Sequence, residues 1–165
     1  MGEISMIKGE IKVVLDKSKI LDDVRKAMKQ LKKTEVVVGI PQEANGAHGP
    51  VTNAQLALIH DNGSPINKIP ARPILLPAIE KAKAEISEKL KAAHQAAAEG
   101  KSDAINPSLE KAGMFAADRV KERFEENDWA PNSPGTIKRK GSDKPLVDTA
   151  ELKKSMTYVV REKGS

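Results

Sequence analysis

Two long stretches of helical periodicity, separated by Gly100, constrain the fold of this 165-residue chain more than any other feature. Apolar residues recur every three or four positions from about Pro73 to Ala98, and again from Asn106-Pro107 to about Asn127. This spacing places them on one face of each helix. Asn106-Pro107 combines a capping side chain with a proline at the first helical position, which favours a helix start. The connection of about seven residues predicts an antiparallel helix pair.

Prolines near the start of the first helix leave its beginning open. Pro77 follows Pro73 by one turn, so either the first turn is kinked or the regular helix begins at Pro77.

Shorter segments supply strands and further helices. The β-branched run Glu35–Ile40 predicts a central strand. The other expected strands are Ile11–Leu15 and Met156–Arg161. The expected short helices are Lys19–Lys33 capped by Ser18, Asn53–His60 opened by a Thr52/Gln55 capping box, one near Pro134–Lys140, and one from a second capping box at Asp148 to Ser155. The fold class is therefore α+β, with a small antiparallel or mixed sheet of about three strands covered by the helix pair and the short helices.

The chain is expected to form one domain, residues 1–165 with a core at about 10–162. Three prolines should keep Ser64–Pro73 extended. The chain would thus carry Pro-rich arms at 62–73 and 130–147, and a flexible tail from Lys163. Aromatic residues make up only 2%, so the core must be aliphatic and rich in Ala. Such a core buries less area per residue, which points to additional burial against neighbouring subunits.

Composition argues against several function classes. There is no cysteine, which excludes disulfides, thiolate metal sites and Cys nucleophiles. The three histidines do not pair by spacing, so neither an enzyme, a metal site nor a cofactor is expected. The sequence contains no apolar run of about 18 residues, so no membrane span is expected. The N-terminus lacks the pattern of a signal peptide, so we expect the protein in a cytoplasm.

A net charge of +5 raises the question of nucleic acid. Most charges are interspersed, which is typical of a solvated surface, but basic residues gather at Lys138, Arg139, Lys140 and Lys144. These side chains could contact phosphates, face solvent, or line a channel.

Two single residues allow alternative interpretations. Trp129, the only Trp, either covers the core or anchors a groove between subunits, since Trp is enriched in interface hot spots. Arg72, at the entry to the long helix, either binds a neighbour's carboxylate or faces water.

The order of the motifs resembles a known family. Asn53–Gly63 leads into Ile69-Pro-Ala-Arg-Pro-Ile-Leu-Leu-Pro-Ala-Ile79, and the helical pair follows. Trp129-Ala-Pro-Asn-Ser-Pro-Gly-Thr-Ile-Lys138, Lys144–Ser155 and a closing strand complete the chain. Over about residues 35–162 this resembles the neck and tail-completion family of tailed bacteriophages, also described as virion morphogenesis or minor tail proteins.

The resemblance implies a structural subunit without enzymatic activity, located at the neck of the virion and assembled in the host cytoplasm. Members form rings around the DNA channel, here a hexamer by analogy. Partners would be the connector or adaptor, the tail terminator or tube, and passing DNA without sequence specificity, but no membrane. The alternative is a basic DNA-binding accessory protein. Candidate assembly contacts are Arg72, Pro73, Trp129, Pro134, Ile137 and Leu146, and candidate lumen- or DNA-facing residues are Lys138, Arg139, Lys140 and Lys144.

Overall fold

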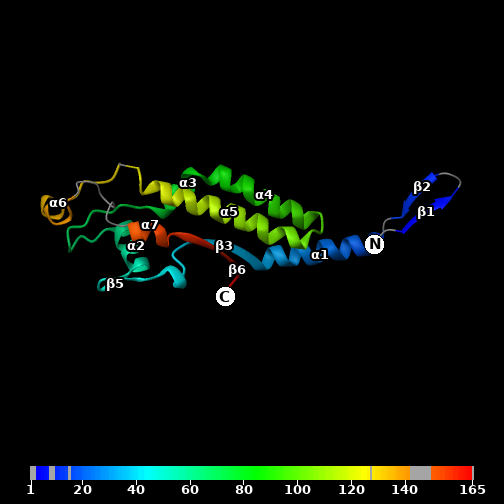
Figure 1. Cartoon of the computed structure of the whole chain (residues 1–165), viewed down its shortest axis with the longest axis horizontal. Coiled ribbons are helices and arrows are strands. Elements are labelled where there is room, and N and C mark those ends of the chain that lie inside the picture. The colour runs from blue at the N-terminus through cyan, green and yellow to red at the C-terminus, as the bar shows by residue number, and fades with distance from the viewer. Residues whose placement is uncertain (1–2, 8–9, 15, 127, 142–149, 165) are drawn as a thin grey trace.

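The computed structural model describes residues 3–7, 10–14, 16–126, 128–141 and 150–164. The fold is α+β, as the sequence predicts, and the chain is mostly helical. Figure 1 shows an elongated molecule with a β-hairpin at one end and a short helix, α6, at the other. The elements are β1 (Glu3–Ile7), β2 (Glu10–Val14), α1 (Lys17–Lys33), β3 (Thr34–Gly39), η1 (Gln42–Ala44), β4 (Ala47–His48), β5 (Val51–Thr52), α2 (Asn53–Asn62), α3 (Leu75–Lys81), α4 (Lys83–Ala98), α5 (Ser102–Arg123), α6 (Pro134–Lys140), α7 (Ala150–Ser155) and β6 (Thr157–Glu162).

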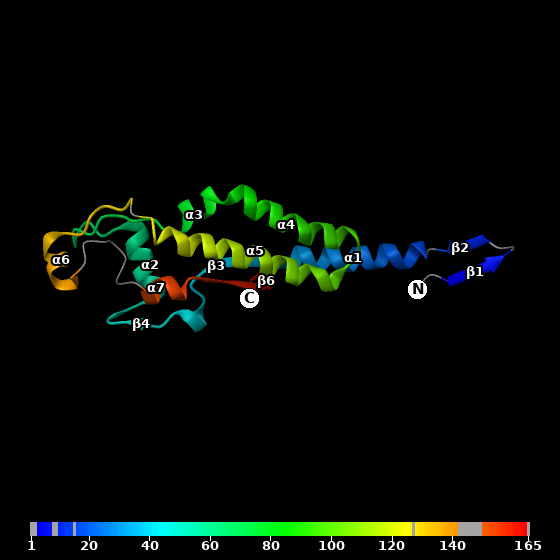
Figure 2. The ribbon, with the colours of Figure 1, turned by 45° about the horizontal axis from the view of Figure 1, so that its top comes forward.

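The helices α4 and α5 form the expected antiparallel pair, which Figure 2 shows along its length. The start expected at Asn106 was wrong, because α5 already begins at Ser102 and Pro107 lies inside it. Pro107 is the sixth residue of α5, so it removes the intrahelical hydrogen bond that an N–H at this position would donate to the carbonyl of Asp103. Upstream, Pro77 lies in the first turn of α3, and the helical path is interrupted at Ala82 instead.

Local capping signals account for most of the shorter helices. The Thr52/Gln55 capping box of α2 is confirmed, with both of its hydrogen bonds formed. Helix α6 begins and ends as predicted, with Ser133 as its N-cap. Helix α1 begins earlier than predicted, because Asp16 rather than Ser18 is its N-cap. The capping box at Asp148 lies outside the described residues.

Among the residues that the structure describes, the sheet at the centre of the molecule has two strands. β3 pairs with β6 in antiparallel register, with Val36 opposite Val160 and Val38 opposite Tyr158. The strand expected at Ile11–Leu15 forms as β2, but it pairs with β1, a strand that was not among the expected ones. β3 is therefore not a central strand. The physical reason is that α1 leads directly into β3 at Thr34, so the chain does not turn back to bring β2 beside β3 (Figure 1).

The core consists of two clusters at different ends of α5. One is rich in alanine and joins α1, α4 and the start of α5 around Ala27, Ala93 and Ile105. The other joins α3, the end of α5, α7 and Trp129 around Ile74, Val120 and Leu152. The Ala-rich, aliphatic core expected from composition is thus present, and small side chains bring the helices close together.

Gly113 is where α5 approaches the sheet most closely. A Cβ built at this position would lie 2.5 Å from Cδ2 of Tyr158 and 2.9 Å from Cγ1 of Val36. Real Cβ atoms do not approach other atoms so closely, so any side chain at residue 113 would push β6 and β3 outward.

We expect Gly113→Ala to lower the free energy of unfolding by up to about 2 kcal/mol. Overpacking destabilises a core by about 1–3 kcal/mol, and the better helix propensity of alanine offsets about 1 kcal/mol of this. Gly135→Ala is the matched control, because a Cβ at this position in α6 meets nothing within 4 Å. Thermal melting checks both, and equal melting temperatures for the two variants would contradict the close approach.

The first arm, and the tail as far as Lys163, are more ordered than expected. Residues 65–68 form a tight turn rather than an extended segment, because Ser64 and Ile69 exchange backbone hydrogen bonds of 2.8 and 2.9 Å. The second arm contains α6. The Lys163 N–H donates to the carbonyl of Lys33 at 2.7 Å, so the tail is held at least to Lys163. Among the described residues, no helix combines the length and apolar character needed to cross a bilayer.

Candidate assembly site

Arg72 joins the two arms. Its side chain is 6% exposed. Nε and Nη2 donate to the carbonyl oxygen of Ala130 at 3.1 and 3.0 Å, and Nη2 also reaches the carbonyl of Pro131 and Oδ1 of Asn132. The backbone N–H of Arg72 donates to the carbonyl of His60 at 2.6 Å. The interpretation that Arg72 faces water is wrong, because its side chain is buried and its guanidinium donates to residues 130–132 of the same chain.

The surroundings of Arg72 explain why it can be buried. Its acceptors in these bonds are neutral oxygens, and burial lowers the pKa of its guanidinium. The forked donors of arginine satisfy several carbonyls at once, which a lysine could not do. Next to it, Asp61 Oδ1 accepts from the N–H of Ile74 at 2.8 Å and fixes the approach to α3. The residues around Arg72 therefore form a rigid junction between residues 60–74 and residues 130–132.

Trp129 closes the core beside this junction. It is 9% exposed and lies in the cluster with Ile74, Phe124 and Leu152. The guanidinium of Arg123 lies 3.8 Å from the centroid of its ring, a cation–π contact. The geometry favours the core interpretation of Trp129 over the anchor in a groove. Its contacts tie the second arm to α3, α5 and α7.

Arg123 is the centre of a small ion cluster. Nη1 donates to Glu126 at 2.5 Å and to Asp128 at 2.6 Å, while Lys81 donates to Glu126 at 2.6 Å. Burial alone would lower the pKa of Arg123, but the hydrogen bonds to Asp128 and Glu126 outweigh it and raise the pKa. This cluster fixes Arg123 over the Trp129 ring.

Acid should weaken the Arg123 cluster. The hydrogen bond from Arg123 lowers the pKa of Asp128, and mainly Lys81 lowers that of Glu126. A carboxyl whose pKa is lowered by folding contributes stability above its ordinary pKa and loses it as the pH falls through the folded value. We expect the melting temperature to fall as the pH drops below about 4. A Glu126→Gln, Asp128→Asn double variant should show a shallower fall, and an identical pH profile would contradict this account.

The remaining candidate residues divide between the junction and α6. Pro73 is exposed beside Arg72, and Pro134 is exposed at the first position of α6. Ile137 is half-buried and Lys138 is exposed on α6. Arg139 and Lys140 belong to the same helix, and Gly141 ends it in the left-handed conformation. Leu146 and Lys144 lie outside the described residues.

Exposed apolar side chains accompany this end of the molecule. Ile66 is 95% exposed in the turn of the first arm, and Leu58 on α2 and Leu76 on α3 are each 64% exposed. The junction thus holds in place a set of apolar side chains that solvent does not favour. Sequence periodicity did not identify them, because none belongs to a long helix.

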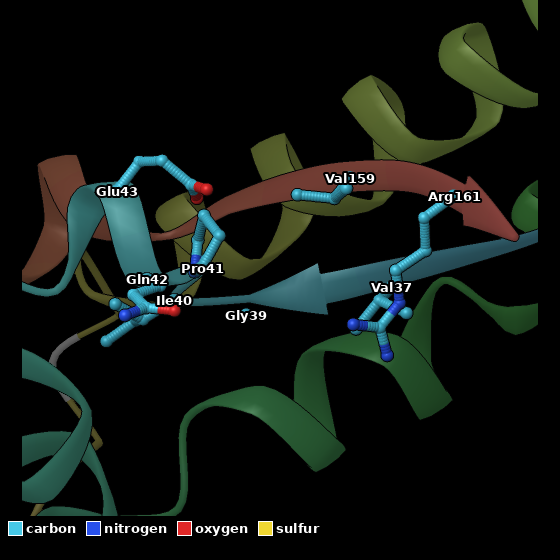
Figure 3. A pocket seen from close by; sticks show the side chains of 8 residues that line it. All are labelled: Val37, Gly39, Ile40, Pro41, Gln42, Glu43, Val159 and Arg161. Carbon is cyan, nitrogen blue, oxygen red and sulfur yellow. The ribbon is translucent and has the colours of Figure 1, made fainter. Parts of the chain in front are cut away.

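The outer face of the sheet carries a shallow pocket of about 450 Å³. Val37 and Val159 come from the paired strands, and Pro41 and Glu43 come from the segment after β3 (Figure 3). Arg161, also at the pocket, donates through Nε to Glu35 at 3.0 Å. Within the described ranges, no three His, Asp or Glu side chains gather closely enough to hold a metal ion.

Comparisons of the chain with protein families, with curated proteins and with solved structures found no match.

Proposed function

We propose that the chain is a structural subunit of a tailed-phage neck, a tail-completion or head–tail joining protein that forms a homo-oligomeric ring around the DNA channel. The observation that carries the proposal is the junction of the two arms. The segments that carry the sequence resemblance, 69–79 and 129–138, meet through Arg72, Ala130 and the Trp129 cluster. Motifs that are about fifty residues apart in the chain are thus parts of one structural unit.

The shape of the subunit suits a ring. A ring subunit needs a rigid body with separate surfaces for its neighbours, and an elongated body provides them at its ends (Figure 1). The exposed Ile66 in the first arm is suited to contact a neighbour, because burial of an isoleucine side chain stabilises a contact by about 1.5–3 kcal/mol. In this arrangement Arg72 and Trp129 act on assembly indirectly, by fixing the positions of the arms.

The ring would contact the connector or adaptor on one side and the tail terminator or tube on the other. Helix α6, with exposed Lys138 and with Arg139 and Lys140 in its last turn, would face the DNA channel. A basic surface attracts any phosphate backbone, so it allows the passage of DNA without reading its sequence.

Localisation in particles tests the proposal. An epitope-tagged chain, produced in the host during phage growth, should be labelled by antibody–gold at the head–tail junction of purified virions in electron micrographs. Label elsewhere on the particle, or particles without the chain, would contradict the proposal.

DNA affinity separates the proposal from the alternative, a basic DNA-binding accessory protein. A channel-lining subunit should bind duplex DNA weakly, with a Kd of about 10⁻⁴–10⁻⁶ M at physiological salt, and without sequence preference. Fluorescence anisotropy with several duplexes measures this. Nanomolar, site-selective binding would favour the accessory protein.

A further inference from the structure

The layer of helices is wider than the layer of strands. Helix α5 packs against both β3 and β6, and α4 packs beside α5. Between β3 and the α3–α4 segment lies an open groove of about 280 Å³. Its lining is almost entirely apolar and includes Val36, Val38, Leu75, Ile79, Ile86 and Leu90. The groove thus exposes side chains that a further strand beside β3 would cover.

The edge of β3 at this groove has no strand partner in the described part of the chain. β3 has six residues and pairs only with β6. Its other edge therefore presents main-chain N–H and C=O groups, which readily pair with an added strand. A free strand edge next to an apolar groove is the arrangement that β-strand addition uses.

The N-terminal hairpin has the length and the apolar pattern that strands added beside β3 would need. Its strands have five residues each, close to the length of β3. The register pairs Ile4 with Val13 and Met6 with Ile11, so these four apolar residues share one face. Ser5 and Lys12 are paired on the other face. A two-stranded hairpin alone is marginally stable in water at best, so it needs a surface to pack against.

The hairpin cannot cover the groove of its own chain. It lies beyond the N-terminal end of α1, apart from the body (Figures 1 and 2). The 17 residues of α1 place Thr34, the nearest residue of β3, about 25 Å from the start of the helix. A five-residue strand spans about 17 Å, so a hairpin folded back along α1 would end before β3 begins. Ala27, which is fully buried among α4 and α5 residues, holds α1 in place.

We propose that the β1–β2 hairpin of one copy adds to the free edge of β3 in a second copy, with its apolar face over the groove. The inference rests on the homo-oligomer of the proposed function and specifies its contact. The hairpin and the groove are different surfaces, so the contact is head-to-tail. Head-to-tail contacts close into a ring when the rotation between copies allows it. The added strands would widen the sheet until it covers both α4 and α5.

Site-directed crosslinking tests the contact, and the absence of native cysteine makes it specific. An Ile11→Cys protein is mixed with an Ile86→Cys protein and treated with a short bis-maleimide. We expect a crosslinked heterodimer, and its loss when Lys12→Cys, on the opposite face of β2, replaces Ile11→Cys. Equal product from both pairs, or from neither, would overturn the proposal.

A second variant separates this inference from the proposed function. Ile11→Asp should convert the oligomer to monomer in sedimentation, with the thermal melting of the body unchanged, whereas Ser5→Asp should leave the oligomer intact. If the wild-type chain assembles and Ile11→Asp assembles equally well, the hairpin contact is wrong and the ring stands. If the wild-type chain does not assemble at any concentration, the ring itself is contradicted.

Discussion

Replacement of Trp129 by alanine is expected to lower the free energy of unfolding of the protomer by about 3–5 kcal/mol. The side chain is 9% exposed, and it packs against residues from α3, α5 and α7. Its removal leaves a cavity between these helices and also removes the ring under the Arg123 guanidinium. Chemical denaturation of the monomer measures the loss.

Trp129→Phe is the matched control. Nε1 of Trp129 is buried without a hydrogen-bond partner in the described part of the chain, so phenylalanine loses volume but no hydrogen bond seen there. We expect Phe to retain more than half of the stability that Ala loses. A Trp129→Ala protein that melts like the wild type but fails to assemble would show instead that Trp129 is an interface residue.

Replacement of Arg72 by alanine is the second large effect we expect, about 1.5–3 kcal/mol, the usual contribution of hydrogen bonds to a charged group. The carbonyls of Ala130 and Pro131 would lose their donor. The effect should be concentrated in the second arm, because α7 and β6 have other contacts with the body. Denaturation measures the global loss, and hydrogen exchange locates it.

Limited trypsin digestion provides a local measurement of the Arg72 junction. Cleavage after Lys138, Arg139 or Lys140 should be faster in Arg72→Ala than in the wild type, while cleavage in α4 should change little. Arg72→Lys keeps the charge but lacks the planar guanidinium with its several donors, so we expect an intermediate rate of cleavage. Equal cleavage rates in wild type and Arg72→Ala would show that the junction does not hold the arm.

Local sequence signals predicted local structure well. The periodicity on both sides of Gly100 predicted the helix pair, because two long helices with a short connection bury their apolar faces by packing against each other. The capping box at Thr52 predicted the start of α2, because its two side chains satisfy backbone donors that the first turn of a helix leaves free. The start of α5 was misplaced because Pro107 was taken as the first helical residue, whereas it lies in the second turn of α5.

Long-range partners were not predictable in the same way. The pairing of β2 with β1 rather than β3 depends on the direction of α1. The acceptors of Arg72 lie about sixty residues further along the chain, and its local sequence carries no sign of them. Gly113 is the exception that could have been found, since a glycine in the middle of a helix costs about 1 kcal/mol and suggests a close approach.

The mass of the assembled chain tests the central claim, that this protein is a ring subunit, most directly. Native mass spectrometry of the purified protein over a concentration series should give one closed species of fixed copy number, six by analogy with the family. Electron micrographs of the same sample should show a ring with a central channel. A monomer at every concentration, or an open series of increasing masses without a closed species, would contradict the claim.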